Sequence, residues 1–213
     1  MTVVEKFGEG GWVTLLSTGL VVALCLAVRA HYAATRARIR AIDRVFEATP
    51  PGDCKDAPPL DPQAPTAVFI VGSSRGGGLH ALLWVLRMFP GHFRNVLFIS
   101  ARTVDAQAYG AEGEIERLRT EASSTLDGFV AFCRSHGIAA DARLAFGIDA
   151  VETLSQMCGE VSRDYPGALF FTSRLVFQRE NLLVRLLHNQ AALAIQRRLH
   201  FEGLQMIILP MKI

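Results

Sequence analysis

Hydrophobic residues are concentrated first in a run of eighteen residues without an ionisable side chain, Gly11–Val28. As a helix, this run would measure roughly 27 Å, close to the ~30 Å hydrocarbon core of a bilayer. Trp12 and Tyr32 are placed to act as aromatic anchors at its two ends. The pattern predicts a transmembrane helix over residues 11–32, preceded by a tail of residues 1–10. A helix buried in a larger assembly is the alternative.

A cleaved signal peptide fits this run less well. Such peptides carry several positive charges ahead of a shorter apolar core. Only Lys6 precedes the run, and Glu5 and Glu9 offset its charge. We therefore expect the helix to stay attached to the mature chain.

The residues that follow the run are rich in arginine, and residues 33–48 have the pattern of a basic amphipathic helix. At 100° per residue, the basic side comprises Arg29, Arg36, Arg40 and Arg44. Positive charge next to a span marks its cytoplasmic end. We therefore expect a single-pass protein of the inner or cell membrane with a cytoplasmic C-terminal domain. The arginine side either binds anionic membrane lipid or is an ordinary solvated face.

A proline-rich segment, residues 49–65, holds six of the nine prolines in the chain. Proline fixes φ and favours extended geometry, so the segment is typical of a semi-rigid linker. A proline-lined loop that packs on the domain is the alternative.

From Thr66 onwards, short apolar runs alternate with longer helical patterns, which predicts an α/β domain over residues 66–213. Unbroken apolar strands separated by helices favour a doubly wound, mostly parallel five-stranded sheet of the Rossmann type. The predicted strands are Thr66–Gly72, Asn95–Ala101, Ala140–Gly147, Ala168–Ser173 and Met206–Pro210. The predicted helices are Gly78–Phe89, Glu112–His136, Asp149 to about Arg163, and Glu180–His200.

Charge and cysteine usage exclude several classes of protein. A net charge of +2 does not suit a nucleic-acid binder. The four cysteines, Cys25, Cys54, Cys133 and Cys158, show no CxxC or Cys/His spacing, so we predict no metal site. We expect Cys133 and Cys158 to pack in the core.

Hydroxyls and arginines follow three of the predicted strands, which indicates a candidate anion site. In a doubly wound sheet, the carboxyl ends of these strands share one edge, where ligands usually bind. Serine hydroxyls and arginine forks suit phosphate or carboxylate. The candidate residues are Ser73, Ser74, Arg75, Gly76, Gly77, Ser100, Arg102, Ser173 and Arg174. The alternative is that the serines cap helices and the arginines are solvated.

Catalysis finds no support, because no nucleophile elbow or carboxylate pair stands near the strand ends. We therefore predict no catalytic residues and a protein that is not an enzyme.

Two helices are too apolar for a lone domain: Gly78–Phe89 has only His80 and Arg87 as polar residues, and Leu182–Leu199 carries two apolar arcs. The surplus predicts a partner surface for a second copy of the chain or for a transporter body.

Three stretches carry a resemblance to a known family: EGGWVTLLSTG leading into the span, VFIVGSSRGGGLHALLWVLRMFPGHFRNVLFIS, and FQRENLLVRLLHNQAALAIQRRLHFEGLQMIILP. Together they resemble the C-terminal portion of APC-superfamily (amino acid, polyamine and organocation) permeases. The resemblance implies a last transmembrane helix followed by a cytosolic domain similar to the universal stress protein fold. With one span and no further helices for a midplane site, the chain is expected to act as an accessory or regulatory domain, not as a transporter on its own.

The same resemblance bears on nucleotides, because the ATP-binding form of the stress-protein fold has a GxxG motif after the fourth strand, followed nine residues later by Gly-Ser or Gly-Thr. In this chain that position reads TSRLVFQRENLLVRLLHN, which holds no glycine. The loop GSSRGGG is neither a P-loop nor a GxGxxG motif. We therefore expect no cofactor and no ATP binding, and the alternative function is an anion- or nucleotide-sensing binding domain of the universal stress type.

Overall fold

The computed structural model describes residues 12–47, 56–72, 75–104, 112–176 and 190–212. The chain divides into two compact units, residues 1–41 and 42–213. The first unit is dominated by helix α2 (Trp12–Glu47), which runs without a break for 36 residues. The segments predicted over 11–32 and 33–48 thus form one helix, because residues 20–47 contain neither proline nor glycine to interrupt it.

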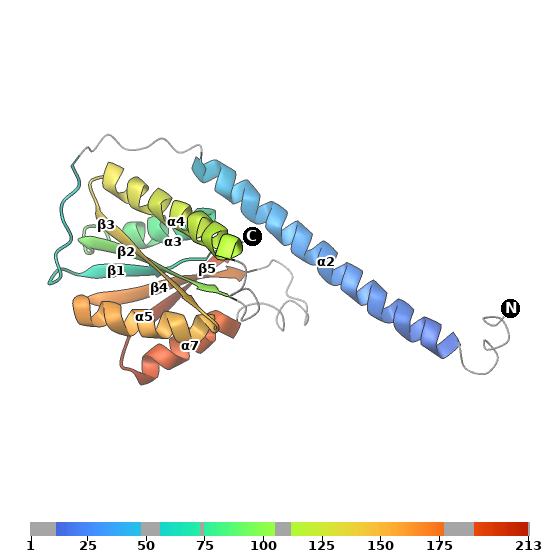
Figure 1. Cartoon of the computed structure of the whole chain (residues 1–213). Helices are drawn as coiled ribbons and strands as arrows, with labels where there is room; N and C mark the ends of the chain where they lie inside the picture. Colours follow the sequence, from blue (N-terminus) through green and yellow to red (C-terminus); the bar gives the residue numbers. More distant parts are fainter. Residues whose placement is uncertain (1–11, 48–55, 73–74, 105–111, 177–189, 213) are drawn as a thin grey trace. The chain divides into compact units, whose positions relative to one another are not determined.

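The second unit is built on a five-stranded sheet in the order β3-β2-β1-β4-β5, and all of its neighbouring strands are parallel (Figure 1). The strands are β1 (Thr66–Ile70), β2 (Asn95–Thr103), β3 (Ala139–Gly147), β4 (Ala168–Val176) and β5 (Met206–Lys212). The chain adds β2 and β3 on one side of β1, and then β4 and β5 on the other. The predicted doubly wound α/β fold is confirmed.

The helices of this unit are α3 (Arg75–Met88), α4 (Glu112–Ser135), α5 (Ala150–Asp164) and α7 (Gln190–Phe201). Asp149 caps α5 as predicted, since its carboxylate accepts from the backbone N–H groups of Val151 and Glu152. Residues 180–189 of the predicted last helix lie outside the described residues. The helix boundaries otherwise match the prediction closely, except that α3 begins three residues early.

Two hydrophobic cores lie on opposite faces of the sheet. The first is formed with α3 and α4, and the second with α5 and α7 (Figure 1). In the first core, Phe69 of β1 is in register with Phe98 of β2 and Phe171 of β4, and its ring stacks on both at 5.7 and 5.4 Å. Because β1 and most of β2 are buried on both sides, unbroken apolar runs suit these two strands.

Residues 56–65 pack on the amino edge of the sheet. The side chain of Asn95, which is 1% exposed, accepts from the Asp61 N–H at 3.1 Å and donates to the Asp61 carbonyl at 2.6 Å. Asn95 also donates to Thr66 Oγ1 at 2.9 Å. Residues 56–65 therefore form a proline-lined loop that packs on the domain, which was the alternative to a linker. Residues 48–55 lie outside the described residues.

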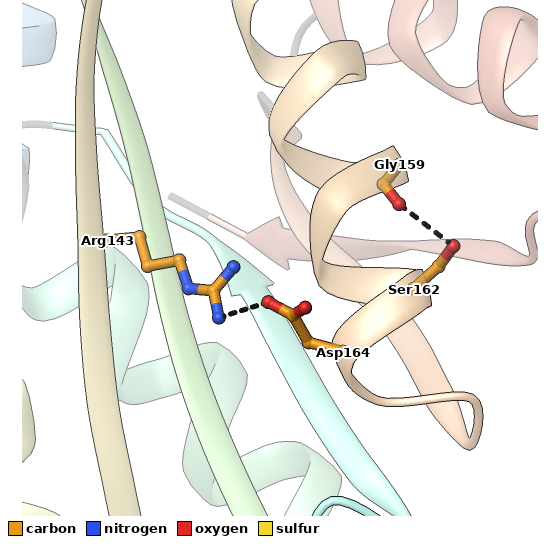
Figure 2. Close-up of polar contacts among 4 residues, drawn as sticks. All are labelled: Arg143, Gly159, Ser162 and Asp164. Carbon is orange, nitrogen blue, oxygen red and sulfur yellow. Dashed lines mark hydrogen bonds and ion pairs between the residues drawn. The ribbon is translucent and has the colours of Figure 1, made fainter.

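Strand β3 lies at one edge of the sheet, where an ion pair joins it to the end of α5. The Arg143 guanidinium donates to the Asp164 carboxylate at 2.6 Å (Figure 2). In the last turns of α5, the Ser162 hydroxyl donates to the Gly159 carbonyl at 3.3 Å, as Figure 2 also shows. Both contacts lie near the surface of the domain.

Candidate functional site

The candidate site lies where strand β1 ends and its two neighbours continue. The last pairs of β1 are Ile70 with Ile99 of β2, and Ile70 with Thr172 of β4. Beyond this level, residues 100–103 of β2 pair only with β3, and residues 173–176 of β4 pair only with β5. The direction of strand addition reverses between β1 and β4, so this is the topological switch point at which open α/β sheets bind ligands.

Ser100 and Ser173 stand at the same level, one residue beyond the pairs formed by Ile70. Side chains alternate between the faces of a strand, so Ser100 shares the face of Phe98, and Ser173 shares the face of Phe171. Both therefore lie on the face covered by α3 and α4. The two serines are about 10 Å apart across β1, which is two strand spacings.

The Ser100 hydroxyl is buried without a partner. Ser100 is 1% exposed, and within the described part of the chain its Oγ is the one buried side-chain oxygen or nitrogen that has no hydrogen bond. A buried hydroxyl left unpaired costs about 1–3 kcal/mol, so such groups are uncommon in folded proteins. Among the described residues of this edge, Ser100 therefore has a buried hydroxyl that could accept a further hydrogen-bond partner.

The first turn of α3 lies at the same edge. The glycine run was expected to form a turn before a helix that starts at Gly78, but the helix begins at Arg75. Gly76, Gly77 and Gly78 are all buried, and a Cβ on Gly78 would collide with the ring of Phe129. A helix N-terminus carries partial positive charge, which favours a nearby anion.

Of the three candidate arginines, only Arg102 has a described side chain. Arg102 lies on β2, two residues beyond Ser100 on the same face, opposite Phe146 of β3, and is partly exposed. Arg75 opens α3, and Arg174 pairs with Pro210 of β5. The side chains of Arg75 and Arg174, and the whole of Ser73 and Ser74, lie outside what is described. The convergence of the arginines therefore stays a prediction.

Acidic residues mark the neighbouring part of this edge. A hollow at the carboxyl end of β3 and the start of α5 is lined in part by Asp149, Glu152 and Glu160. Its carboxylates would repel an anion, so the region between β2 and β4 is the better place for an anion site on the described part of the edge.

The sequence did not predict that β2 and β4 extend further than β1. The last residues of β2 and β4 lack the apolar pattern from which strand ends are predicted.

The four arginines predicted to face the membrane all lie on α2. Arg29 is exposed, whereas the side chains of Arg36, Arg40 and Arg44 lie outside the described set. The segment Trp12–Ala30 of the same helix has a mean hydropathy of 2.0, and none of it is buried by other parts of the chain. By length and composition it is able to span a membrane.

Thiol and metal chemistry receive no support from the described residues. Burial raises the pKa of the Cys133 thiol to about 12. Burial, with the nearby Glu202 carboxylate, does the same for Cys158. Both side chains are 0% exposed and pack in the core, as predicted. In the described ranges, no three His, Cys, Asp or Glu side chains are grouped to hold a metal ion.

The sequence matches no protein-family model, and no curated protein matches it. Among solved structures, the chain is similar to a protein of the universal stress protein family from Burkholderia pseudomallei, with 16% identity over 72% of this chain and 100% of that chain, at a TM-score of 0.47. It is also similar to a universal stress protein from Archaeoglobus fulgidus, with 14% identity over 68% of this chain and 93% of that chain, at a TM-score of 0.46.

Proposed function

We propose that the chain is a membrane-anchored accessory or regulatory protein, in which α2 spans the membrane and the α/β domain lies in the cytoplasm. The observation that carries the proposal is the segment Trp12–Ala30, which has a mean hydropathy of 2.0, holds Arg29 near its end as its one charged residue, and is 0% buried. Leaving this much apolar surface in water is unfavourable, whereas a bilayer covers it completely.

The arginines that follow the apolar segment support the cytoplasmic placement. Arg29 lies at the C-terminal end of the span, and Arg36, Arg40 and Arg44 come after it, while Lys6 is the one lysine or arginine in residues 1–11. This asymmetry is typical of a helix whose C-terminal end faces the cytoplasm.

The accessory role is supported by the resemblance to permease C-terminal portions. The proposed partner is the transmembrane core of a permease or a second copy of the chain. In either case the role is one of interaction, not of catalysis or nucleic-acid binding. An in-frame permease core in the DNA immediately upstream would support the link, and an unrelated upstream gene would count against it.

The anchor is tested by charge insertion. Lysine at the centre of a span costs about 2.5–3.5 kcal/mol, so L20K/L24K should move the chain from the membrane pellet to the soluble fraction after a carbonate wash. The matched control L20I/L24I should stay in the pellet. Recovery of the wild-type chain in the soluble fraction would contradict the anchor.

Orientation needs its own measurement. A fluorescent protein that matures only in the cytoplasm, fused after Ile213, should be bright, and alkaline phosphatase fused at the same point should be inactive. The reverse pattern would place the domain outside the cell and remove the proposed cytoplasmic role.

A second candidate function, sensing of a small anion, is favoured by the unpaired Ser100 hydroxyl at the edge of the sheet where α3 begins. An anion there would accept hydrogen bonds from the hydroxyl and gain from the helix N-terminus. A ligand at a hundredfold excess over its dissociation constant stabilises a protein by about 2.7 kcal/mol, which a thermal melt detects.

The test compares melting temperatures with inorganic phosphate, nucleotides and cyclic dinucleotides. The variant R75Q/R102Q/R174Q should lose any ligand-induced shift, whereas the control R163Q/R197Q/R198Q, which neutralises three exposed arginines away from the strand ends, should keep it. Equal shifts in both variants would exclude an anion site at this edge.

A further inference from the structure

The outer face of α3 exposes large apolar side chains. Leu83 is 42% exposed, Trp84 37%, Met88 55%, and Phe89, which directly follows the helix, 38%. His80 and Arg87 lie on the same side of the helix and are exposed as well. We call this set of six residues the α3 face.

The α3 face is separate from the core-facing side of the helix. At 100° per residue, His80, Leu83, Trp84, Arg87 and Met88 fall within one arc. The opposite arc holds Leu82 and Val85, which are both 0% exposed and pack in the first core. The helix is thus apolar on both sides, although packing on the sheet requires only one apolar side.

The stretch of chain that carries the α3 face has acidic residues only at its ends. No aspartate or glutamate occurs between Asp61 and Asp105, whereas Arg87 and Arg94 within this stretch are exposed. His80 and His92 are exposed too. Large apolar and aromatic side chains next to arginine, without carboxylates, are typical of surfaces that lie in the headgroup region of anionic membranes.

We propose that the α3 face binds the anionic lipid surface of the membrane in which α2 is anchored, inserting Trp84 and Met88 between the headgroups. This inference rests on the proposed anchor, which holds the domain near the membrane and so raises the effective concentration of lipid at the α3 face. Docking of this kind needs no protein partner.

A second copy of the chain fits the α3 face less well. The four exposed apolar side chains offer on the order of 350 Å² together, whereas a stable dimer buries about 800 Å² on each partner. Two copies meeting face to face would also bring Arg87 and Arg94 near their counterparts, with no carboxylate on the stretch between Asp61 and Asp105 to offset the repulsion. Anionic headgroups supply that charge.

The chain offers a direct test, because Trp12 and Trp84 are its only tryptophans. W12F leaves Trp84 as a reporter of docking, and W84F leaves Trp12 as a reporter of insertion. Each variant is reconstituted as the full chain, one copy per lipid nanodisc. The discs contain phosphatidylcholine with or without phosphatidylglycerol, and the lipids are brominated near the headgroup end of the acyl chains.

In discs with phosphatidylglycerol, Trp84 fluorescence should shift to shorter wavelength, be quenched by bromine and be shielded from acrylamide. The variant R87E/R94E should lose this quenching, and the control R163E/R197E, with the same charge change on α5 and α7, should keep it. Trp12 should be quenched in every case.

Two outcomes would overturn the proposal. One is a Trp84 that stays open to acrylamide and unquenched while Trp12 is quenched, in which case the anchor stands and the docking fails. The other is shielding of Trp84 only when two copies share a disc, without bromine quenching, which would assign the α3 face to a second copy. An unquenched Trp12 would instead refute the anchor itself.

Discussion

Gly78 of α3 lies directly against the ring of Phe129 of α4. A Cβ placed on Gly78 would come within 2.8 Å of Phe129 Cε1 and 3.2 Å of Val71 Cγ1. Phe129 cannot retreat easily, because it is 0% exposed and its ring stacks on Phe98 with centroids 4.9 Å apart. The two helices therefore meet at a point where no side chain fits.

We predict that Gly78→Ala lowers the free energy of unfolding. Overpacking a tight core costs about 1–3 kcal/mol, which exceeds the gain of up to about 1 kcal/mol that alanine brings to a helix. Chemical denaturation of the two proteins measures the difference. The control is Gly113→Ala in α4, where a Cβ would meet no atom within 4 Å and stability should hold or rise. Equal effects at both positions would contradict the close contact.

The ion pair between Arg143 and Asp164 should contribute little, although its geometry is good. The two side chains are 34% and 52% exposed, and exposed pairs are typically worth about 0.2–1 kcal/mol. A double-mutant cycle with R143Q and D164N, followed by urea unfolding, measures the coupling. A coupling energy above about 2 kcal/mol would mean that this pair holds the edge strand β3 in place, contrary to the prediction.

The thiols of Cys133 and Cys158 should be unreactive until the domain unfolds. Burial removes them from reagents, and it raises their pKa to about 12, so little thiolate forms. In C25S/C54S, which retains only these two cysteines, modification by a maleimide should follow the denaturant unfolding curve. Fast modification of the native domain would show that one of the helices carrying them, α4 or α5, opens locally.

The same thiols predict a loss of stability in alkali. A thiol whose folded pKa lies above its unfolded value contributes stability that is fully present below the unfolded pKa, near 9, and is lost as the pH rises towards about 12. Urea midpoints should therefore fall over this range. The fall should be smaller in C133A/C158A, relative to that variant's own midpoint below pH 9. Parallel curves would contradict the prediction.

Much of the fold follows from the sequence, because apolar strands, an Asp149 cap and helix-stopping glycines are local signals. The early start of α3 does not, since Gly76 and Gly77 are weak helix formers and their sequence alone favours a turn. The packing of residues 56–65 on the sheet involves Asn95, a buried polar residue. Its hydrogen-bond partner Asp61 lies 34 residues away in the sequence, so no local pattern predicts the contact.

The candidate site divides in the same way. The alternation of strands and helices predicts a parallel sheet, and the carboxyl ends of parallel strands share one edge. The sequence therefore predicts that the serines after these strands lie at the switch point. The burial of the Ser100 hydroxyl could not be read from the sequence. It depends on the level at which β1 stops and on how α3 and α4 cover the neighbouring strands, and both are set by packing between distant residues.

Ser100 supplies the sharpest test of the anion site, because stability and binding should change in opposite directions. Without ligand, Ser100→Ala removes a buried hydroxyl that has no partner, so the free energy of unfolding should hold or rise by up to about 1–3 kcal/mol. With an anion that raises the melting temperature of the wild-type domain, the same variant should show a smaller shift. Ser155→Ala is the matched control, since the Ser155 hydroxyl is also buried but donates to the Val151 carbonyl at 2.7 Å. Its loss should lower stability slightly and leave the ligand-induced shift unchanged. If Ser100→Ala destabilises the ligand-free domain more than Ser155→Ala does, the Ser100 hydroxyl has a structural partner and the anion site loses its main support.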